Sequence, residues 1–441
     1  MTSSFDFTVP SLGIPKIPSP LPFSGSGGNY RAAFVSDEQR IIFDITASAD
    51  MPSGNYRKED LLEIAGPREN IFFDPAHVHA GIVTCGGLCP GLNDVIYSMV
   101  MSLWYRYGVR RISGIQFGYR GFLPESKMPV MDLSPEKVFE IHKMGGTILG
   151  SSRGGGDRII EIVDAMERMN LNILFTIGGD GTLKGSLAIA EEVEKRGLKI
   201  ACVGIPKTID NDLSFVERSF GFETAVASAV DAVAGAHTEA HDAINGVGIV
   251  KVMGRESGFI AAHTTLASGD VNYVLIPEVP FSMQGENGLL IHLKNRLEQR
   301  NHALILVAEG AGQELLEETT ETDASGNKLL SDIGLYLKQE IKKYFHEQNM
   351  EMNVKYIDPS YMIRSAAANA GDSIYCTRLG TNAVHAAMAG KTKILISLVN
   401  NTFVHLPIHL AVSRRNLVDP ESSLWRDVIE TTGQPFLMKK V

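Results

Sequence analysis

A short acidic, glycine-rich turn has the residue types that phosphate chemistry needs. Residues 178–182 read Gly-Gly-Asp-Gly-Thr and directly follow the apolar run 172–177. The glycines allow phosphate oxygens to approach the backbone, and Asp180 can hold Mg²⁺ directly or through water. A plain structural turn is the alternative. We interpret the segment as a candidate site for Mg²⁺ and nucleotide phosphates.

A second polar segment follows the next apolar run along the chain. Residues 206–212 read Pro-Lys-Thr-Ile-Asp-Asn-Asp, so two carboxylates lie at i and i+2 and a lysine lies three residues before the first. Asp210 can accept a proton from a hydroxyl group while Lys207 offsets the charge of a transferring phosphoryl group. An Asx-rich turn, whose carboxylates cap local N–H groups, is the alternative. The position of this segment, one strand–helix unit after Asp180, favours the catalytic interpretation.

Glycines also open a third turn, in residues 85–93, which read Cys-Gly-Gly-Leu-Cys-Pro-Gly-Leu-Asn. The segment follows a strand-like run and precedes an expected helix, where backbone N–H groups can hold phosphate oxygens. A simple glycine turn is again the alternative. The spacing of Cys85 and Cys89 is neither that of a zinc site nor that of a redox pair. We therefore interpret both cysteines as packing residues.

Arginines follow two further strand-like segments. Residues 253–255, Met-Gly-Arg, end one of them, and residues 361–364, Tyr-Met-Ile-Arg, end another candidate strand. A guanidinium group can bind a phosphate through two hydrogen bonds, although a surface ion pair is the commoner role of a single arginine. Glu309 follows the apolar run 303–307 and is suited either to binding sugar hydroxyl groups or to capping a helix.

These segments are connected by an alternation of strand-like and helix-like stretches. Strands are expected at residues 79–84, 172–177, 199–205, 247–253, 274–276, 303–307 and 393–399. Helices are expected at residues 93–104, from residue 182 to about 195, and at 222–233, where apolar residues recur at helical spacing. This alternation predicts an α/β protein with mainly parallel sheets covered on both faces. So many units require more than one sheet, and therefore two domains.

Composition limits the classes of protein that fit the chain. Its 441 residues are 44 % hydrophobic and 21 % charged, which is an ordinary globular balance. With 41 Lys plus Arg against 51 Asp plus Glu, the net charge of −10 argues against nucleic acid and anionic membranes as partners. No apolar run has the length that spans a bilayer. Four cysteines are too few for a disulfide framework, and we expect a cytoplasmic location.

The order of these motifs resembles that of the 6-phosphofructokinase family over residues 77–436. The most specific segments are residues 178–182, 206–212, 253–255 and 355–364. Residues 355–364 and 220–226 look like the plant and trypanosomatid ATP-dependent branch, and residues 431–435 are similar to plant members. The resemblance implies a magnesium-dependent, allosteric enzyme of glycolysis that transfers a phosphoryl group from ATP to the 1-hydroxyl of fructose 6-phosphate.

The resemblance also implies a role for each matching position. Asp210 would be the base that accepts the proton of the 1-hydroxyl, with Arg255 and Lys207 offsetting charge, and Asp180 would hold Mg²⁺. The residues expected to bind ATP are Gly87, Arg153, Gly154, Gly179, Asp180, Gly181 and Thr182. Those expected to bind fructose 6-phosphate are Thr208, Ile209, Asp210, Asp212, Met253, Gly254, Arg255, Glu309, Tyr361, Met362, Ile363 and Arg364.

Two positions bear on the identity of the phosphoryl donor. Pyrophosphate-dependent relatives carry Lys where this chain has Lys207, and they usually carry Asp where it has Gly181. A side chain at position 181 would fill space that the α-phosphate of ATP needs, so Gly181 favours ATP. The plant and trypanosomatid ATP enzymes resemble this chain in pairing Gly with Lys. Pyrophosphate is the alternative donor, and a non-catalytic sensor of nucleotide or sugar phosphate is the second alternative.

We expect two Rossmann-like domains with the active site in the cleft between them. Residues 1–76 would form an N-terminal extension with a partly mobile arm, and residues 77–220 the domain for ATP and Mg²⁺. Residues 221–400 would form the fructose 6-phosphate domain, and residues 401–441 a C-terminal segment that packs back on the core. The family resemblance implies a homotetramer. Short bacterial members supply an arginine to the neighbouring subunit at a position that is Gly246 here, and glycine has no side chain that could make this contact.

Overall fold

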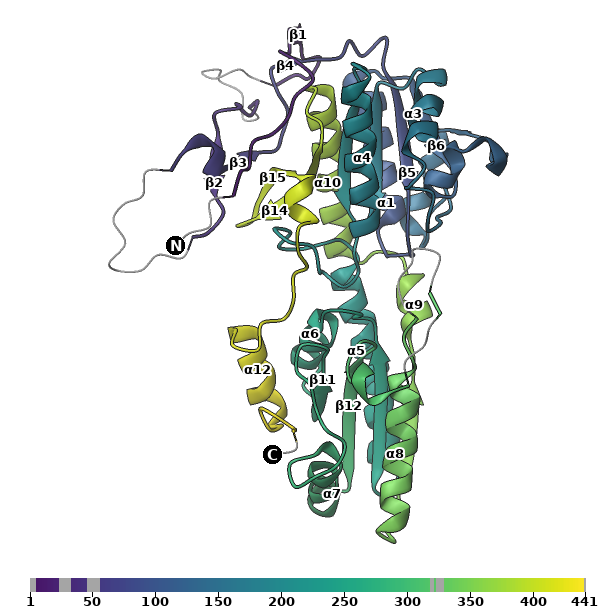
Figure 1. Ribbon diagram of the computed structural model, residues 1–441, viewed down its shortest axis with the longest axis vertical. Coiled ribbons are helices and arrows are strands. Elements are labelled where there is room, and N and C mark those ends of the chain that lie inside the picture. Colours follow the sequence, from purple (N-terminus) through teal and green to yellow (C-terminus); the bar gives the residue numbers. More distant parts are fainter. Residues whose placement is uncertain (1–4, 24–32, 46–55, 318–320, 323–328, 440–441) are drawn as a thin grey trace. The chain divides into compact units, whose positions relative to one another are not determined.

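The computed structural model describes residues 5–23, 33–45, 56–317, 321–322 and 329–439 (Figure 1). The chain divides into two units, and neither is continuous in sequence. Unit 1 comprises Met1–Thr208, Leu213–Phe220 and Ala367–Arg415, and unit 2 comprises Ile209–Asp212, Gly221–Ala366 and Asn416–Val441.

Unit 1 is built on a nine-stranded sheet in the order β2-β3-β15-β14-β9-β8-β5-β6-β7. The central strands pair in parallel and are β6 (Arg111–Ile115), β5 (His79–Thr84), β8 (Ile173–Gly178), β9 (Ala201–Pro206) and β14 (Ile394–Val399). The flanking strands pair antiparallel and are β2 (Arg40–Ile42), β3 (Leu61–Ile64), β15 (Thr402–Pro407) and β7 (Met131–Asp132). A separate two-stranded ribbon joins β1 (Ile17–Pro18) and β4 (Asn70–Ile71).

Helices pack on the sheet of unit 1 and bury its central strands. They are α1 (Leu92–Met101), α2 (Pro135–Val138), α3 (Ile159–Arg168), α4 (Asp180–Lys195), α10 (Ala370–Met388) and α11 (Ile408–Ala411). Ile162 of α3 and Ile189 of α4 lie in one core cluster with Leu174 of β8. Helices α1 and α10 pack closely at Gly380. A Cβ atom added at this glycine would overlap the Oγ atom of Ser98. Buried, apolar central strands are typical of parallel sheets covered by helices.

Unit 2 contains a four-stranded, fully parallel sheet in the order β11-β12-β10-β13. Its strands are β10 (Gly246–Val252), β11 (Tyr273–Leu275), β12 (His302–Ala308) and β13 (Asn353–Ile357). Its helices are α5 (Phe222–His241), α6 (Phe259–Ser268), α7 (Leu289–Arg300), α8 (Ile333–Glu347), α9 (Ser360–Arg364) and α12 (Ser423–Thr432). Successive residues of a strand point to opposite faces. Val250 accordingly packs with α5, α6 and α12, whereas Ile249 packs with α7 and α8.

The expected α/β class with mainly parallel sheets is confirmed. Each strand that was expected with a defined residue range begins and ends within two residues of an observed one. The four cysteines, all within the described residues, are buried and form no disulfide. In the part of the chain that the structure describes, no helix combines the length and the apolarity that crossing a membrane requires.

The boundary expected at residue 400 differs from the division in the structure. Residues 367–415 belong to unit 1, because β14 pairs in parallel with β9 and α10 packs on α1. The expected C-terminal segment 401–441 is divided in turn, with β15 in unit 1 and α12 in unit 2. A strand–helix pattern does not say which of two sheets its strand joins.

The N-terminal extension contributes strands to unit 1. Residues 1–4 and 24–32 of the expected arm lie outside the described residues. In the described part, β1 pairs with β4, β3 pairs with β15, and Phe7 is 2 % exposed in a core cluster with Leu62. The described part of the extension is therefore attached to the sheet.

Two buried histidines of unit 1 form hydrogen bonds with neighbouring side chains. The hydroxyl group of Tyr107 lies 2.8 Å from Nδ1 of His385, and Nδ1 of His405 lies 2.8 Å from a carboxylate oxygen of Glu63. Burial lowers the pKa of both histidines from 6.5 to about 4. Both rings are therefore uncharged in the folded protein at neutral pH.

We expect the free energy of unfolding to fall between pH 7.5 and pH 5.5. The unfolded chain binds protons at these histidines at a pH where the folded chain does not, so each histidine contributes about 1 kcal/mol to the fall. His385→Gln removes one such site, and urea unfolding at the two pH values should show a difference smaller by that amount. The exposed His346→Gln is the matched control. An unchanged pH difference in His385→Gln would contradict the assignment.

Candidate active site

The segments that begin at Cys85, Gly178 and Pro206 lie at the ends of three neighbouring parallel strands of unit 1, which are β5, β8 and β9. Thr84 of β5 pairs with Ile177 of β8, and Gly178 of β8 pairs with Pro206 of β9. The strands therefore end at the same level, and the residues after them emerge at one edge of the sheet. This edge, at the carboxyl ends of the strands, is where α/β sheets bind ligands.

Lys207 connects the turns after β9 and β5. Its side chain is buried, and its Nζ atom donates a hydrogen bond of 2.9 Å to the carbonyl oxygen of Gly87. Its backbone N–H group donates to the carbonyl oxygen of Gly178 at 3.0 Å. A Cβ atom at Gly179 would lie 3.1 Å from the Lys207 carbonyl oxygen. The lysine thus brings a positive charge into the middle of the glycine turns, where a phosphate group would need it.

Asp180 is the first residue of α4, after the N-cap Gly179. Its carboxylate forms an ion pair of 2.9 Å with Lys184 one turn along the helix, and its side chain is 28 % exposed. A Cβ atom added at Gly181 would meet nothing within 4 Å. The carbonyl oxygen of the buried Thr182 accepts a hydrogen bond of 2.7 Å from the hydroxyl group of Tyr119. A helix N-terminus with open space beside it is suited to binding phosphate groups.

This arrangement fits Mg²⁺ held together with a nucleotide. Magnesium usually takes one or two protein carboxylates and completes its shell with water and substrate phosphates. Asp180 supplies one partly exposed carboxylate at the turn. Among the described residues, no three His, Cys, Asp or Glu side chains are placed to hold a metal ion by themselves.

Arg153 and Gly154 lie beside the turn after β5. Cys85 and Ser152 form an isolated parallel bridge, and the N–H group of Gly86 donates to the carbonyl oxygen of Ser152 at 2.9 Å. A Cβ atom at Gly87 would lie 3.9 Å from Nη2 of Arg153, so the guanidinium group reaches that turn. Gly154 has a φ of 80°, which lies in the left-handed region that favours glycine. The expected ATP-binding residues thus lie on turns of unit 1 or in the first turn of α4.

The second half of the segment 206–212 belongs to unit 2. The hydroxyl group of Ser257 donates to the carbonyl oxygen of Asp210 at 3.2 Å, and the N–H group of Asn416 donates to that of Asp212 at 2.8 Å. The two hydrogen bonds hold the backbone of the acidic pair from both sides. Asn211 between them has a φ of 56°, a conformation that Asn adopts more readily than most residues.

Neighbouring parallel strands of unit 2 also end together. Val252 of β10 pairs with Ala308 of β12, so residues 253–255 and Glu309 emerge at one edge. The N–H group of Glu309 donates to the carbonyl oxygen of Val252 at 2.9 Å, and that of Gly310 donates to Gly254 at 3.0 Å. Met253 is 1 % exposed, whereas the side chain of Arg255 is 26 % exposed. The arginine and the glutamate can thus both face a ligand.

The segment expected to end a strand is instead the short helix α9, which follows β13 after two residues. Tyr361 is 85 % exposed and Met362 is 78 % exposed, but Ile363 is 1 % exposed in the core cluster that contains Met253. The side chain of Ile363 therefore packs the helix onto unit 2, and only the backbone of this residue is left to contact a ligand. Arg364 lies on the last turn of α9.

Two polar residues near residues 253–255 were not among the predicted ones. Ser257 bonds the backbone of Asp210, and a carboxylate oxygen of Glu278 accepts hydrogen bonds from the N–H groups of Gly258 and Val418 at 3.0 and 2.8 Å. Burial raises the pKa of Glu278. Ser257 follows β10 and Glu278 follows β11. A polar residue soon after a strand is the sequence signal that could have identified them.

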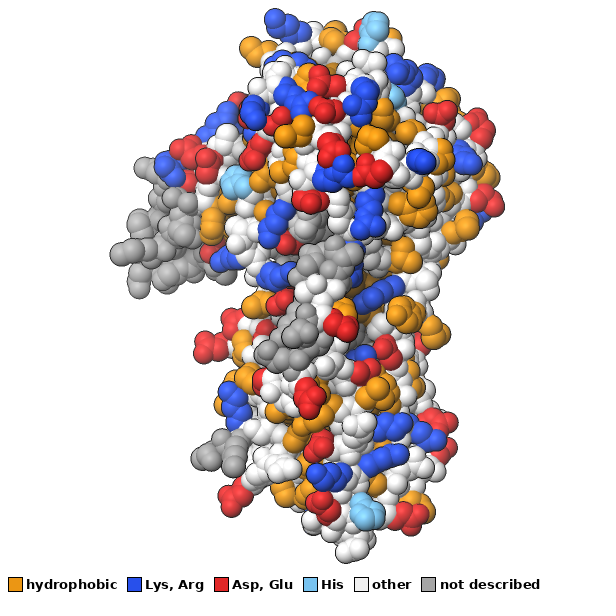
Figure 2. Space-filling view, turned by 45° about the vertical axis from the view of Figure 1, so that its right-hand side comes forward, with side chains coloured by type: hydrophobic (Ala, Val, Ile, Leu, Met, Phe, Trp, Pro, Cys, Tyr) orange, Lys and Arg blue, Asp and Glu red, His pale blue; other side chains and the backbone are white. Residues whose placement is uncertain are grey.

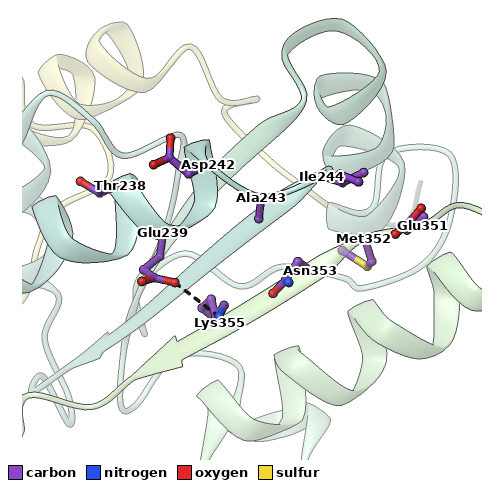
Figure 3. A pocket seen from close by; sticks show the side chains of 9 residues that line it. All are labelled: Thr238, Glu239, Asp242, Ala243, Ile244, Glu351, Met352, Asn353 and Lys355. Atoms are coloured by element: carbon purple, nitrogen blue, oxygen red, sulfur yellow. Dashed lines mark ion pairs between the residues drawn. The ribbon is translucent and has the colours of Figure 1, made fainter.

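A cavity of about 390 Å³ lies at the opposite edge of the sheet of unit 2 (Figure 3). Residues of the end of α5 and of the amino ends of β10 and β13 line it, among them Glu239, Asp242, Glu351 and Lys355. Glu239 and Lys355 form an ion pair of 3.3 Å. None of the predicted site residues lines this cavity.

Comparison with known proteins identifies similar chains over almost the full length. Residues 79–387 match the family profile described as Phosphofructokinase. An ATP-dependent 6-phosphofructokinase of Borreliella burgdorferi is 58 % identical over 99 % of this chain and 98 % of its own. A chloroplastic ATP-dependent 6-phosphofructokinase of Arabidopsis thaliana is 52 % identical over 86 % of this chain and 70 % of its own. The crystal structure of a pyrophosphate-dependent phosphofructokinase from Nitrosospira multiformis has the same fold, with a TM-score of 0.66. Its sequence is 18 % identical, and the match covers 81 % of this chain and 92 % of that chain.

The variant Gly310→Ala tests whether catalysis requires the turn after β10 to keep its position. A Cβ atom at this position would lie 1.8 Å from the carbonyl oxygen of Arg255, so Gly310→Ala must displace that backbone. We expect kcat/KM for the expected sugar phosphate to fall by at least about tenfold, because small displacements of binding groups have large effects on rate. Steady-state kinetics measures it.

Gly235→Ala on α5 is the matched control, since its added methyl group meets nothing within 4 Å. Equal kcat/KM values in the two variants would show that this turn tolerates displacement.

Proposed function

Since the chain belongs to the phosphofructokinase family, we propose that it transfers the γ-phosphoryl group of ATP to the 1-hydroxyl of fructose 6-phosphate. The products are fructose 1,6-bisphosphate and ADP. The relatives that match almost the whole chain are named as ATP-dependent enzymes, which makes this chain an ATP-dependent kinase. The observation in the structure that supports ATP most directly is the open space at Gly181, where a larger donor than pyrophosphate needs room.

On the donor side, we propose that the turns of unit 1 bind the phosphate groups of ATP. The proposed residues are Gly87, Arg153, Gly154, Gly179, Asp180, Gly181 and Thr182. Backbone N–H groups at the start of α4 would donate to phosphate oxygens, while Arg153 and Lys207 would offset their charge. Asp180 would hold Mg²⁺, which when bound neutralises charge on the transferred phosphoryl group.

On the acceptor side, we propose Asp210 as the general base. Its carboxylate would take the proton from the 1-hydroxyl as that oxygen forms its bond to the γ-phosphorus, and the bond to the bridging oxygen of ADP breaks. Arg255 would stabilise the negative charge on the transferring group. The residues proposed to surround fructose 6-phosphate are Thr208, Ile209, Asp212, Met253, Gly254, Arg255, Glu309, Tyr361, Met362, Ile363 and Arg364.

We propose that the protein forms a homotetramer and is located in the cytoplasm. Large apolar side chains are exposed on unit 1, among them Tyr105, Phe139, Met144 and Ile160. Figure 2 shows hydrophobic side chains between charged ones on one face of the molecule. Four buried cysteines without a disulfide suit a reducing compartment.

The donor is tested by initial rates with Mg²⁺ and fructose 6-phosphate, supplying ATP or pyrophosphate in parallel. We expect turnover with ATP and none with pyrophosphate. Gly181→Asp should lower kcat/KM for ATP by about a hundredfold, because a carboxylate would fill the space beside the phosphates and repel them. Gly181→Ala is the matched control that adds volume without charge. Turnover of the parent with pyrophosphate alone would overturn the proposed donor.

The base is tested by Asp210→Asn, which keeps the shape of the side chain and removes its proton acceptor. We expect kcat to fall by about 10²- to 10⁴-fold, while fructose 6-phosphate still binds in a calorimetric titration. The exposed Asp231→Asn on α5 controls for loss of a carboxylate. Full turnover in Asp210→Asn would mean that another group takes the proton.

A further inference from the structure

Lys251 is a largely buried cation of unit 2 that has no role in the proposed reaction. It lies on β10, its side chain is 12 % exposed, and its Nζ atom is 2.8 Å from Asp332 and 3.0 Å from Asp358. The hydroxyl group of Tyr356 on β13 donates to Asp332 at 2.9 Å. One ammonium group therefore holds two carboxylates from different parts of the chain. Burying a charge in this way is costly unless its partners are fixed.

The pairing of the sheet explains how these groups meet. Val250 of β10 pairs with Ile357 of β13, so the next residues, Lys251 and Asp358, continue side by side past the end of the pairing. Burial would raise the pKa of both carboxyl groups, yet both pKa values are lowered. For Asp332 the main cause is the hydrogen bond from Lys251, and for Asp358 it is the hydrogen bonds from Ser360, followed by the contact with Lys251. The ion pairs are therefore fully formed at neutral pH.

Asp358 connects Lys251 to the helix that is proposed to bind the sugar phosphate. One of its oxygens accepts hydrogen bonds from the N–H group and the hydroxyl group of Ser360, at 3.0 and 2.5 Å. Ser360 is the first residue of α9, and Tyr361 follows it. Asp358 thus fixes the start of this helix from one side, while Lys251 fixes Asp358.

Asp332 connects Lys251 to the turn after β12. Its carboxylate caps α8 by accepting the N–H group of Leu335 at 3.0 Å. The preceding carbonyl oxygen, of Ser331, accepts a hydrogen bond of 3.0 Å from the amide group of Gln313, which also donates to the carbonyl oxygen of Glu309 at 2.8 Å. Lys251 itself lies two residues before Met253. The network therefore reaches three segments of unit 2 that carry proposed substrate residues: residues 253–255, Glu309 and α9.

We propose that Lys251 is a positioning residue for the sugar-phosphate site, which through Asp358 and Asp332 sets residues 253–255, Glu309 and α9 relative to one another. The proposal rests on the proposed function of those residues. An ordinary stabilising ion pair would tie any two elements together. Lys251 instead joins three segments that would contact the same ligand. The two carboxylates of Asp332 and Asp358 repel each other when the ammonium group is removed.

The test is steady-state kinetics of Lys251→Met in the full-length enzyme, varying fructose 6-phosphate and ATP separately. We expect KM for fructose 6-phosphate to rise about tenfold or more, while KM for ATP stays within about twofold. Lys251→Arg, which keeps the charge, should restore most of the affinity. Lys355→Met is the matched control, because Lys355 lies on β13 in a more exposed ion pair with Glu239.

A second variant keeps the test decisive if Lys251→Met does not fold. Asp358→Asn removes one charge but keeps the shape of the side chain, and it should raise KM for fructose 6-phosphate in the same direction. Where both variants fold, their effects should not add, because they break the same contact. A folded Lys251→Met or Asp358→Asn enzyme with the parent's KM for fructose 6-phosphate would overturn the proposal.

The parent enzyme separates this inference from the proposed function. If the parent does not turn over fructose 6-phosphate, the proposed reaction fails, and calorimetric binding of fructose 6-phosphate to the parent and to Lys251→Met then decides the positioning role. Weaker binding to the variant would support it, and equal binding would overturn it. A parent that does not bind the sugar phosphate at all would overturn both.

Discussion

Parallel strand pairing is the constraint on which both halves of the proposed site depend. In a parallel sheet, the register determines which residues reach the carboxyl edge together. In unit 1 the pairing of Gly178 with Pro206 brings the start of α4 to the level of Lys207. In unit 2 the pairing of Val252 with Ala308 brings Arg255 to the level of Glu309. A shift of either register by one residue would turn the side chains of a strand to the opposite face of the sheet and would move the residues after it out of level with those of its neighbour.

The turns of unit 1 and those of unit 2 differ in the space beside their backbones. Glycines at 87 and 181 leave volume next to the backbone, and the buried Lys207 and the helix start supply positive potential there. In unit 2 the volume is instead filled, since Gly254 and Gly310 are in contact with neighbouring backbone. The donor turns are therefore open and the acceptor turns are tightly packed. This difference suits a flexible triphosphate on one side and a sugar of defined shape on the other.

The sequence predicted the class of fold, most strands and the turns that carry chemistry, because apolar runs followed by glycine or acidic residues are local signals. It could not predict that residues 367–415 complete unit 1, since the partner of β14 is a strand nearly two hundred residues away. It also missed Lys251, whose partners Asp332 and Asp358 become neighbours only through the register of β10 and β13. The burial of Ile363 depends in the same way on packing between distant segments. Long-range pairing, rather than local propensity, was the information that was lacking.

The interleaving of the two units along the chain has a consequence for synthesis on the ribosome. Unit 1 lacks α10, β14 and β15 until about residue 407 has been made. Unit 2 lacks α12 and Met438, which is 4 % exposed in its core, until the last few residues have been added. Domains usually fold one after another as the chain emerges. Here neither unit can complete its core before residues beyond 400 have been made, so the nascent protein has to keep the sheet of unit 1 and the exposed apolar core of unit 2 from aggregating until late in synthesis.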